Sequence, residues 1–188
     1  MKLALYAMVP ALALLAGCSA EPKPAAAPAP TFHDVMKDKV DVNADALWDV
    51  ANAAIGQDGG LDPQKMTDAQ WTQIATRAEA VQQAALEIAR MDPVVLARRG
   101  VKISDEGLPG GHTAAQVQAQ IDANPQGLRD MAEVLAVHMG DMAKAAHAHD
   151  AARAGPLIDQ LDTVCEDCHL EYWYPTQKAL IEQYNIKR

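Results

Sequence analysis

The chain has 188 residues, carries a formal net charge of −9 and contains only 4% aromatic residues. So acidic a chain offers no basic patch to meet phosphate groups, which argues against nucleic-acid binding. Alanine is abundant, and no segment alternates polar and apolar residues as a half-buried strand would, so the sequence favours an all-α fold.

Residues 1–17, MKLALYAMVPALALLAG, have the pattern of a secretory signal peptide: a lysine, a short apolar run and small residues at the end. The run is shorter than the roughly 20 apolar residues of a membrane-spanning helix. The segment that ends in Cys18 resembles the lipobox of bacterial lipoproteins. This resemblance implies a lipid anchor on Cys18 and export to the periplasmic side of a bacterial membrane, and Ser19 slightly favours the outer membrane. An ordinary signal peptide that happens to contain a cysteine is the alternative.

The next segment, SAEPKPAAAPAP, is rich in proline and alanine and has no periodic apolar face. It predicts an extended tether of polyproline character. We therefore divide the chain into a signal peptide (1–17), a lipidated cysteine with its tether (18–30) and one folded domain (31–188).

Four amphipathic helices are predicted in the folded domain, because apolar residues recur there at steps of three and four. The first covers about 31–55 and the second about 68–91. The third begins at Asn124-Pro125, and the fourth follows Gly155-Pro156 and reaches at least Tyr174. Helices of this length indicate an antiparallel four-helix bundle.

A long connection, residues 93–123, separates the second helix from the third and contains a short predicted helix at 113–122. A connection of this length within a compact domain usually has a role of its own.

The motif Cys165-Glu166-Asp167-Cys168-His169 admits three kinds of chemistry. A structural zinc site needs four ligands with paired spacing, and the only other cysteine of the chain is Cys18. A thioredoxin-type thiol switch needs its CxxC at a helix start after a strand, whereas this motif lies inside a helical segment. Covalent attachment of a c-type haem needs CxxCH and takes place outside the cytoplasm.

Helical spacing favours the haem interpretation. Cys165 and Cys168 lie on one face of a helix, so both sulfur atoms can reach one edge of a porphyrin, and His169 can turn its imidazole toward the iron. The sequence therefore predicts one haem c, bound through Cys165 and Cys168, near the C-terminal helix.

A CxxCH close to the C-terminus, on the fourth helix of a bundle, resembles the class II cytochromes c, the cytochrome c prime family. The resemblance covers about residues 31–188. It implies a left-handed four-helix bundle with haem inside one end and His169 as the proximal iron ligand. It also implies homodimers in many members and, in low-spin members, a methionine of the first helix as the sixth ligand.

Met36 is the candidate for that sixth ligand, because it lies near the start of the first helix on its apolar stripe. The alternative is that Met36 is ordinary core packing. His33 and His138 are weaker candidates: His33 lies beside the tether, and a lone histidine on an apolar face, such as His138, is more often hydrogen-bonded than metal-bound.

These residues predict a membrane-anchored cytochrome that transfers one electron, with His169 and Met36 as axial ligands and with redox proteins, not yet identified, as partners. The first alternative is a five-coordinate haem protein that binds NO or CO. The second is a structural or thiol-redox lipoprotein without haem. No motif of an enzyme is present, so we expect no catalytic activity. Asp34, Asp38 and Asp41 flank Met36 and form either an acidic rim for a basic partner or a plain solvated face.

One stretch does not fit the resemblance. Tyr172-Trp173-Tyr174-Pro175 follows the motif directly, and Pro175 predicts a kink or an end of the fourth helix, followed by a short helix at 177–184. We expect the three aromatic residues to shield one edge of the haem.

Overall fold

The computed structural model describes residues 28–57 and 59–184, and these residues form an all-helical domain. The predicted signal peptide, Cys18 and most of the tether lie outside the described residues. No strand occurs in the described part of the chain, where Ile55 and Leu61 form a single isolated bridge. No helix among these residues is both long and apolar enough to cross a membrane.

The helices have the following bounds in chain order: α1 (Phe32–Val35), η1 (Met36–Asp41), α2 (Val42–Ala53), η2 (Pro63–Lys65), α3 (Asp68–Ala89), α4 (Ala114–Ala123), α5 (Pro125–His147), α6 (Ala151–Cys168), η3 (His169–Trp173) and α7 (Pro175–Tyr184). η2 is a 3₁₀-helix, and η1 and η3 are π-helical. α1, η1 and α2 follow one another directly and make up the first predicted helix.

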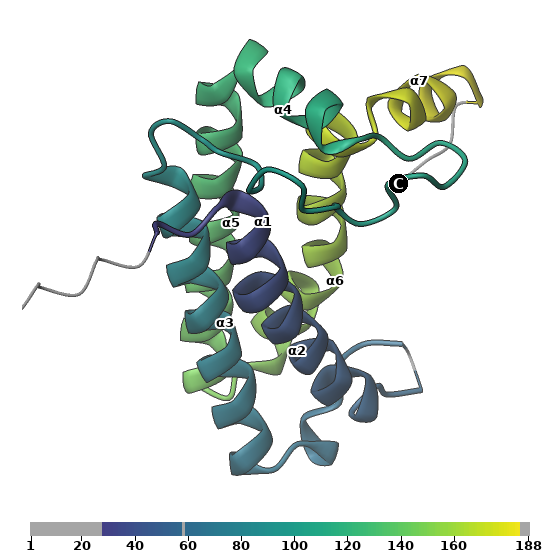
Figure 1. Ribbon diagram of the computed structural model, residues 1–188. Coiled ribbons are helices and arrows are strands. Elements are labelled where there is room, and N and C mark those ends of the chain that lie inside the picture. The colour runs from purple at the N-terminus through teal and green to yellow at the C-terminus, as the bar shows by residue number, and fades with distance from the viewer. Residues whose placement is uncertain (1–27, 58, 185–188) are drawn as a thin grey trace, which may run out of the picture.

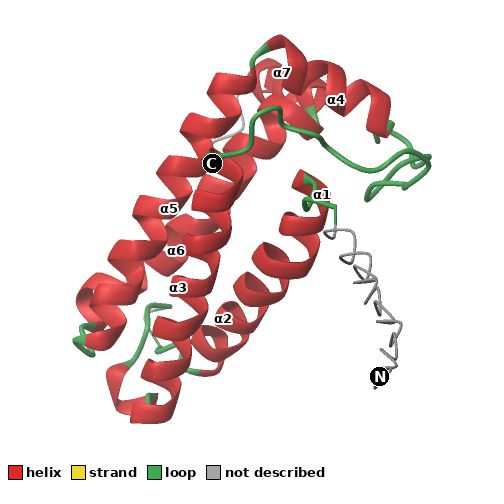
Figure 2. Cartoon of the chain, turned by 60° about the vertical axis from the view of Figure 1, so that its left-hand side comes forward, coloured by secondary structure: helices red, strands yellow, loops and turns green. Residues whose placement is uncertain are grey.

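The long helices lie side by side (Figures 1 and 2). α3 packs against α2 and α5, and α6 packs against α5. Both views place α4, α7 and the loop between α3 and α4 at one end of these helices. That end also contains α1 and the last turns of α6, so it holds the residues that the sequence marks as functional.

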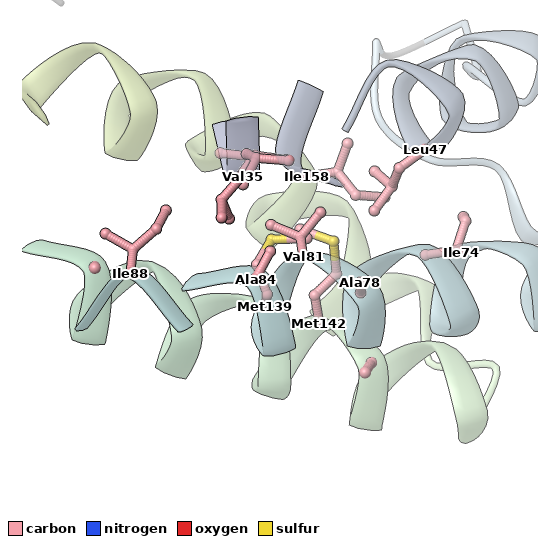
Figure 3. Packing of buried hydrophobic residues seen from close by; sticks show 14 of the residues in the cluster. Val35, Leu47, Ile74, Ala78, Val81, Ala84, Ile88, Met139, Met142 and Ile158 are labelled. Carbon is pink, nitrogen blue, oxygen red and sulfur yellow. The ribbon is translucent and has the colours of Figure 1, made fainter. Parts of the chain in front are cut away.

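Aliphatic side chains from α1, α2, α3, α5 and α6 meet in the core (Figure 3). Leu47, Ile74 and Met142 are fully buried there. Each such side chain stabilises the fold by about 1.5–3 kcal/mol through removal of apolar surface from water. Alanines 75, 78 and 85 of α3 are also fully buried. Their small side chains explain how an alanine-rich sequence packs its helices closely.

Polar caps set the helix starts where the sequence predicts them. Thr31, Thr67 and Thr113 each form a capping box with the residue three positions later. The Asn124 side chain accepts a hydrogen bond from the backbone N–H of Gly127, and Pro125 occupies the first position of α5. The predicted helices at 68–91, at 113–122 and after Asn124 are thereby confirmed to within about two residues at their ends.

The predicted break at Gly155-Pro156 is wrong, because α6 already begins at Ala151 and Pro156 lies inside it. The chain turns instead at His149, which has φ +53°. The N–H of His149 donates to Ala146 and that of Asp150 donates to Ala145, a pattern that usually requires glycine. Asp150 then caps α6 through its side chain. The turn therefore uses residues that sequence rules rank below a Gly-Pro pair.

Candidate functional site

A cavity of about 390 Å³ lies between the first helical segment and the helices α5 and α6. Met36, Cys165, Cys168 and His169 all border it. Its remaining walls include a set of apolar side chains: Val40, Ala44, Ile88, Leu128, Met131, Ala132, Leu135 and Leu170. A volume of this size falls in the range of small-molecule and cofactor sites, about 300–1,000 Å³.

The two cysteines are presented by the last turn of α6, one helical turn apart, and both are half-buried and free. Burial, with a smaller contribution from Asp162, raises the pKa of the Cys165 thiol to about 11. Burial likewise raises the pKa of Cys168 to about 12, with help from the neighbouring Cys165. Reactive redox cysteines have lowered pKa values. The environment of this CxxC therefore argues against a thiol switch.

His169 follows Cys168 as the first residue of η3 and is half-buried at the cavity. Burial lowers the pKa of its imidazole, and the carboxylates of Asp41 and Asp162 oppose that shift without reversing it. The neutral ring, which has a free lone pair for a metal, is therefore the favoured form at neutral pH.

Met36 is the first residue of η1 and borders the same cavity from the opposite end of the chain. Its neighbour Val35 is fully buried, whereas Met36 itself is only half-buried. The structure thus brings Met36 together with the CxxCH motif at one cavity, across more than 120 residues of sequence.

Both candidate ligands begin a π-helical turn, which the sequence did not predict. In η3 the N–H of Tyr174 donates to the carbonyl of His169, five residues earlier, over 2.7 Å. Pro175 has no N–H to continue the i→i−4 hydrogen bonds of the helix. It is the feature of the sequence that could have indicated this distortion. η1 has no comparable signal. Single π turns occur frequently at functional sites.

The aromatic stretch after His169 serves three separate contacts. Tyr172 is buried, and its hydroxyl donates to the carbonyl of Asn124 over 2.9 Å. Trp173 packs against Phe32 with 6.4 Å between ring centroids. The hydroxyl of Tyr174 hydrogen-bonds to the Asp105 carboxylate.

Tyr174 alone of the three aromatic residues borders the larger cavity. A second cavity of about 140 Å³ touches Met36 and His169 and is also lined by His33, Trp173 and Tyr174. Of the three aromatic residues expected to shield the haem, Tyr174 thus borders the larger cavity, Trp173 and Tyr174 border the smaller one, and Tyr172 borders neither. The short helix predicted after this stretch is α7, which begins at Pro175.

Of the three acidic residues that flank Met36 in the sequence, only Asp41 borders the larger cavity. Asp34 accepts hydrogen bonds from Thr31 and forms an ion pair with Arg98 at 2.9 Å, so its charge is engaged locally. Asp41 does border the cavity, where partial burial raises the pKa of its carboxyl. The other acidic residues at the cavity come from two helices, α2 and α6: Asp45, Asp162 and Glu166.

The remaining candidate histidines do not reach the larger cavity. The ring of His138 hydrogen-bonds to the carbonyl of Leu157 at 2.8 Å, as expected for a histidine on an apolar face. His33 borders only the smaller cavity. Throughout the described part of the chain, no three His, Cys, Asp or Glu side chains gather as they would around a metal ion held by protein ligands alone.

No family model matches the chain, and neither a curated protein nor a solved structure matches it.

Proposed function

We propose that this protein is a class II-type cytochrome c that carries one covalent haem and transfers single electrons. The observation that carries the proposal is the shared cavity, bordered by both cysteines and the histidine of the CxxCH motif and by Met36. In this proposal the segments α1–η1–α2, α3, α5 and α6 form an antiparallel four-helix bundle with the cofactor site near one end.

The residues at the cavity fit a haem in their chemistry. The free thiols of Cys165 and Cys168 would form the two thioether bonds, and the neutral His169 imidazole would be the proximal ligand. The apolar part of the lining suits the faces of a porphyrin. When bound, haem would supply a one-electron iron couple.

Met36 would be the sixth ligand, because its thioether is the one soft donor that borders the cavity from the first helical segment. A methionine ligand raises the reduction potential relative to a second histidine. A competing function, the binding of NO or CO at an open iron site, is favoured by the smaller cavity of about 140 Å³ beside Met36 and His169. In that case Met36 would be packing only.

Attachment through a lipid on Cys18 would hold the domain on the periplasmic side of a bacterial membrane. The acidic residues at the cavity, Asp41, Asp45, Asp162 and Glu166, suit a redox partner with a basic docking face. We therefore infer a basic docking face on the redox partner.

The raised pKa values of both thiols weigh against the thiol-redox alternative.

The test is the absorption spectrum and mass of the protein produced with a haem-attachment system. We expect the mass of the mature chain plus one haem, and a low-spin spectrum that becomes high-spin in Met36→Ala. Met131→Ala is the matched control, because Met131 borders the same cavity from α5. A high-spin spectrum in the unaltered protein would favour gas binding, and a mass without haem would refute both haem functions.

A further inference from the structure

The His169 ring lacks the usual support of a metal-ligating histidine. Such histidines almost always donate their second ring N–H to a carboxylate, carbonyl or water, which fixes the orientation of the ring. Within residues 28–57 and 59–184, no protein group makes a hydrogen bond to either ring nitrogen of His169. The ring contact of His169 within these residues is an aromatic one, with Tyr174.

Tyr174 makes that contact in two ways. Its backbone N–H donates to the His169 carbonyl over 2.7 Å and closes the π turn of η3. Its ring lies edge-on to the imidazole, with 6.4 Å between centroids and 85° between planes. This is a favoured geometry for two aromatic rings. Both residues border both cavities, so the contact lies at the candidate site itself.

The long loop between α3 and α4 holds Tyr174 in place. The tyrosine hydroxyl hydrogen-bonds to the carboxylate of Asp105, in the turn at 104–107 of that loop. Asp105 has φ +63°, a conformation that costs a non-glycine residue free energy and tends to persist at functional sites. Gly111 packs directly against the Asp105 carbonyl, where a Cβ atom would clash.

The loop is itself fixed to the bundle next to the site. The carbonyls of Val95 and Leu96 accept hydrogen bonds from the N–H groups of Phe32 and His33, at 2.9 and 2.8 Å. These bonds tie the loop to the start of α1, the segment that leads into Met36. The first part of the loop that carries Asp105 is thereby hydrogen-bonded to α1.

We propose that Tyr174 is a positioning residue, held by Asp105, that fixes the plane of the His169 imidazole. This role rests on the proposed function only in that His169 would be the iron ligand. It gives a role to Tyr174 within the aromatic stretch after His169 and to Asp105 within the long loop.

Two readouts test the proposal on four variants. The first is the set of nuclear Overhauser cross-peaks between the Tyr174 and His169 rings in the diamagnetic form of the full-length protein. The second is the rhombicity of the ferric electron paramagnetic resonance spectrum of the haem-loaded protein, which follows the imidazole plane. Tyr174→Phe removes only the hydroxyl, Asp105→Ala removes the acceptor, and Asp105→Asn keeps a carbonyl acceptor. Tyr184→Phe removes a tyrosine hydroxyl from the exposed end of α7 as a control.

We expect Tyr174→Phe and Asp105→Ala to weaken the cross-peaks and to shift the rhombicity together, and Asp105→Asn and Tyr184→Phe to leave both unchanged. Unchanged cross-peaks and rhombicity in Tyr174→Phe and Asp105→Ala would overturn the proposal. If the protein takes up no haem, the proposed function fails, and the cross-peaks still decide whether Asp105 and Tyr174 orient the His169 ring.

Discussion

The hydroxyl of Tyr172 donates to the backbone carbonyl of Asn124 over 2.9 Å and so ties the end of η3 to the start of α5. Asn124 is also the cap of α5, so one residue anchors a helix and the chain segment that follows the CxxCH motif. Gly127 makes the approach possible, because a Cβ atom there would lie 2.6 Å from the tyrosine oxygen.

Tyr172→Phe should therefore destabilise the domain by about 1 kcal/mol, the usual net value of one such hydrogen bond. The ring stays in place, so only the bond to the Asn124 carbonyl is lost. Chemical denaturation measures the change in the free energy of unfolding. Tyr184→Phe is the control, since Tyr184 is 68% exposed. Equal stability of the two variants would contradict a structural role for the Tyr172 hydroxyl.

The cysteines predict a stability loss at alkaline pH in protein without haem. The folded pKa values are raised to about 11 for Cys165 and about 12 for Cys168, so the folded state favours the protonated thiols. The contribution of these two thiols to stability is fully present below the unfolded thiol pKa of about 8.5. It falls as the pH rises toward the folded values, because the unfolded state binds fewer protons there.

Thermal unfolding between pH 8 and 11 measures this dependence. Tyr172 and Tyr174 contribute in the same direction, because burial raises the pKa of each to about 12. The Cys165→Ser/Cys168→Ser variant isolates the thiol part and should show a shallower decline. Haem attachment should have the same effect, since thioethers do not titrate. An equally steep decline in the serine variant would show that the thiols are not buried in this way.

Helical periodicity was enough to predict the all-α fold and the starts of the helices at Asp68 and Pro125, because local capping determines those positions. It failed at Pro156, where packing and the cap at Asp150 keep a proline inside α6. Pro156 is the sixth residue of α6, so its missing N–H costs the helix one backbone hydrogen bond, the one to the carbonyl of Ala152.

At the candidate site, the sequence predicted the cysteines, His169 and Met36 as one group, and all of them border one cavity. It did not predict the contact between Tyr174 and Asp105, which lie 69 positions apart. Nor did it predict the local ion pair of Asp34 with Arg98. Such pairings depend on the path of the loop after α3, which follows no periodic pattern.

Two glycines inside long helices should respond differently to alanine. At Gly155 of α6 a Cβ atom would meet Leu61 at 3.5 Å, an ordinary contact. Gly155→Ala should stabilise the domain by up to about 0.5–1 kcal/mol, because alanine loses less backbone entropy in a helix, while the following Pro156 lowers this gain. At Gly140 of α5 a Cβ atom would clash with the amide of Gln82. That amide donates to the Ala136 carbonyl over 3.1 Å, so the substitution also disturbs a hydrogen bond.

Gly140→Ala should therefore gain less stability than Gly155→Ala or lose stability outright. Denaturation midpoints of the two variants, measured side by side, give the comparison. Gln82→Ala combined with Gly140→Ala relieves the clash and serves as the internal control. A larger gain from Gly140→Ala alone than from Gly155→Ala would contradict the packing described at Gln82.

The pair formed by Asp34 and Thr31 predicts how stability falls in acid. Hydrogen bonds from the backbone and hydroxyl of Thr31 lower the pKa of Asp34, and the charge of Arg98 adds to the shift. A lowered folded pKa stabilises the protein above the unfolded value of about 3.9. That contribution is lost as the pH falls through the folded value, because the unfolded state then binds more protons.

Thermal unfolding between pH 2 and 6 should show a shallower loss of stability with falling pH in Asp34→Asn than in the unaltered protein. Asp38→Asn is the matched control, since Asp38 is exposed one turn further on. The same acid slope in both variants would show that Asp34 is not held by its cap and by Arg98.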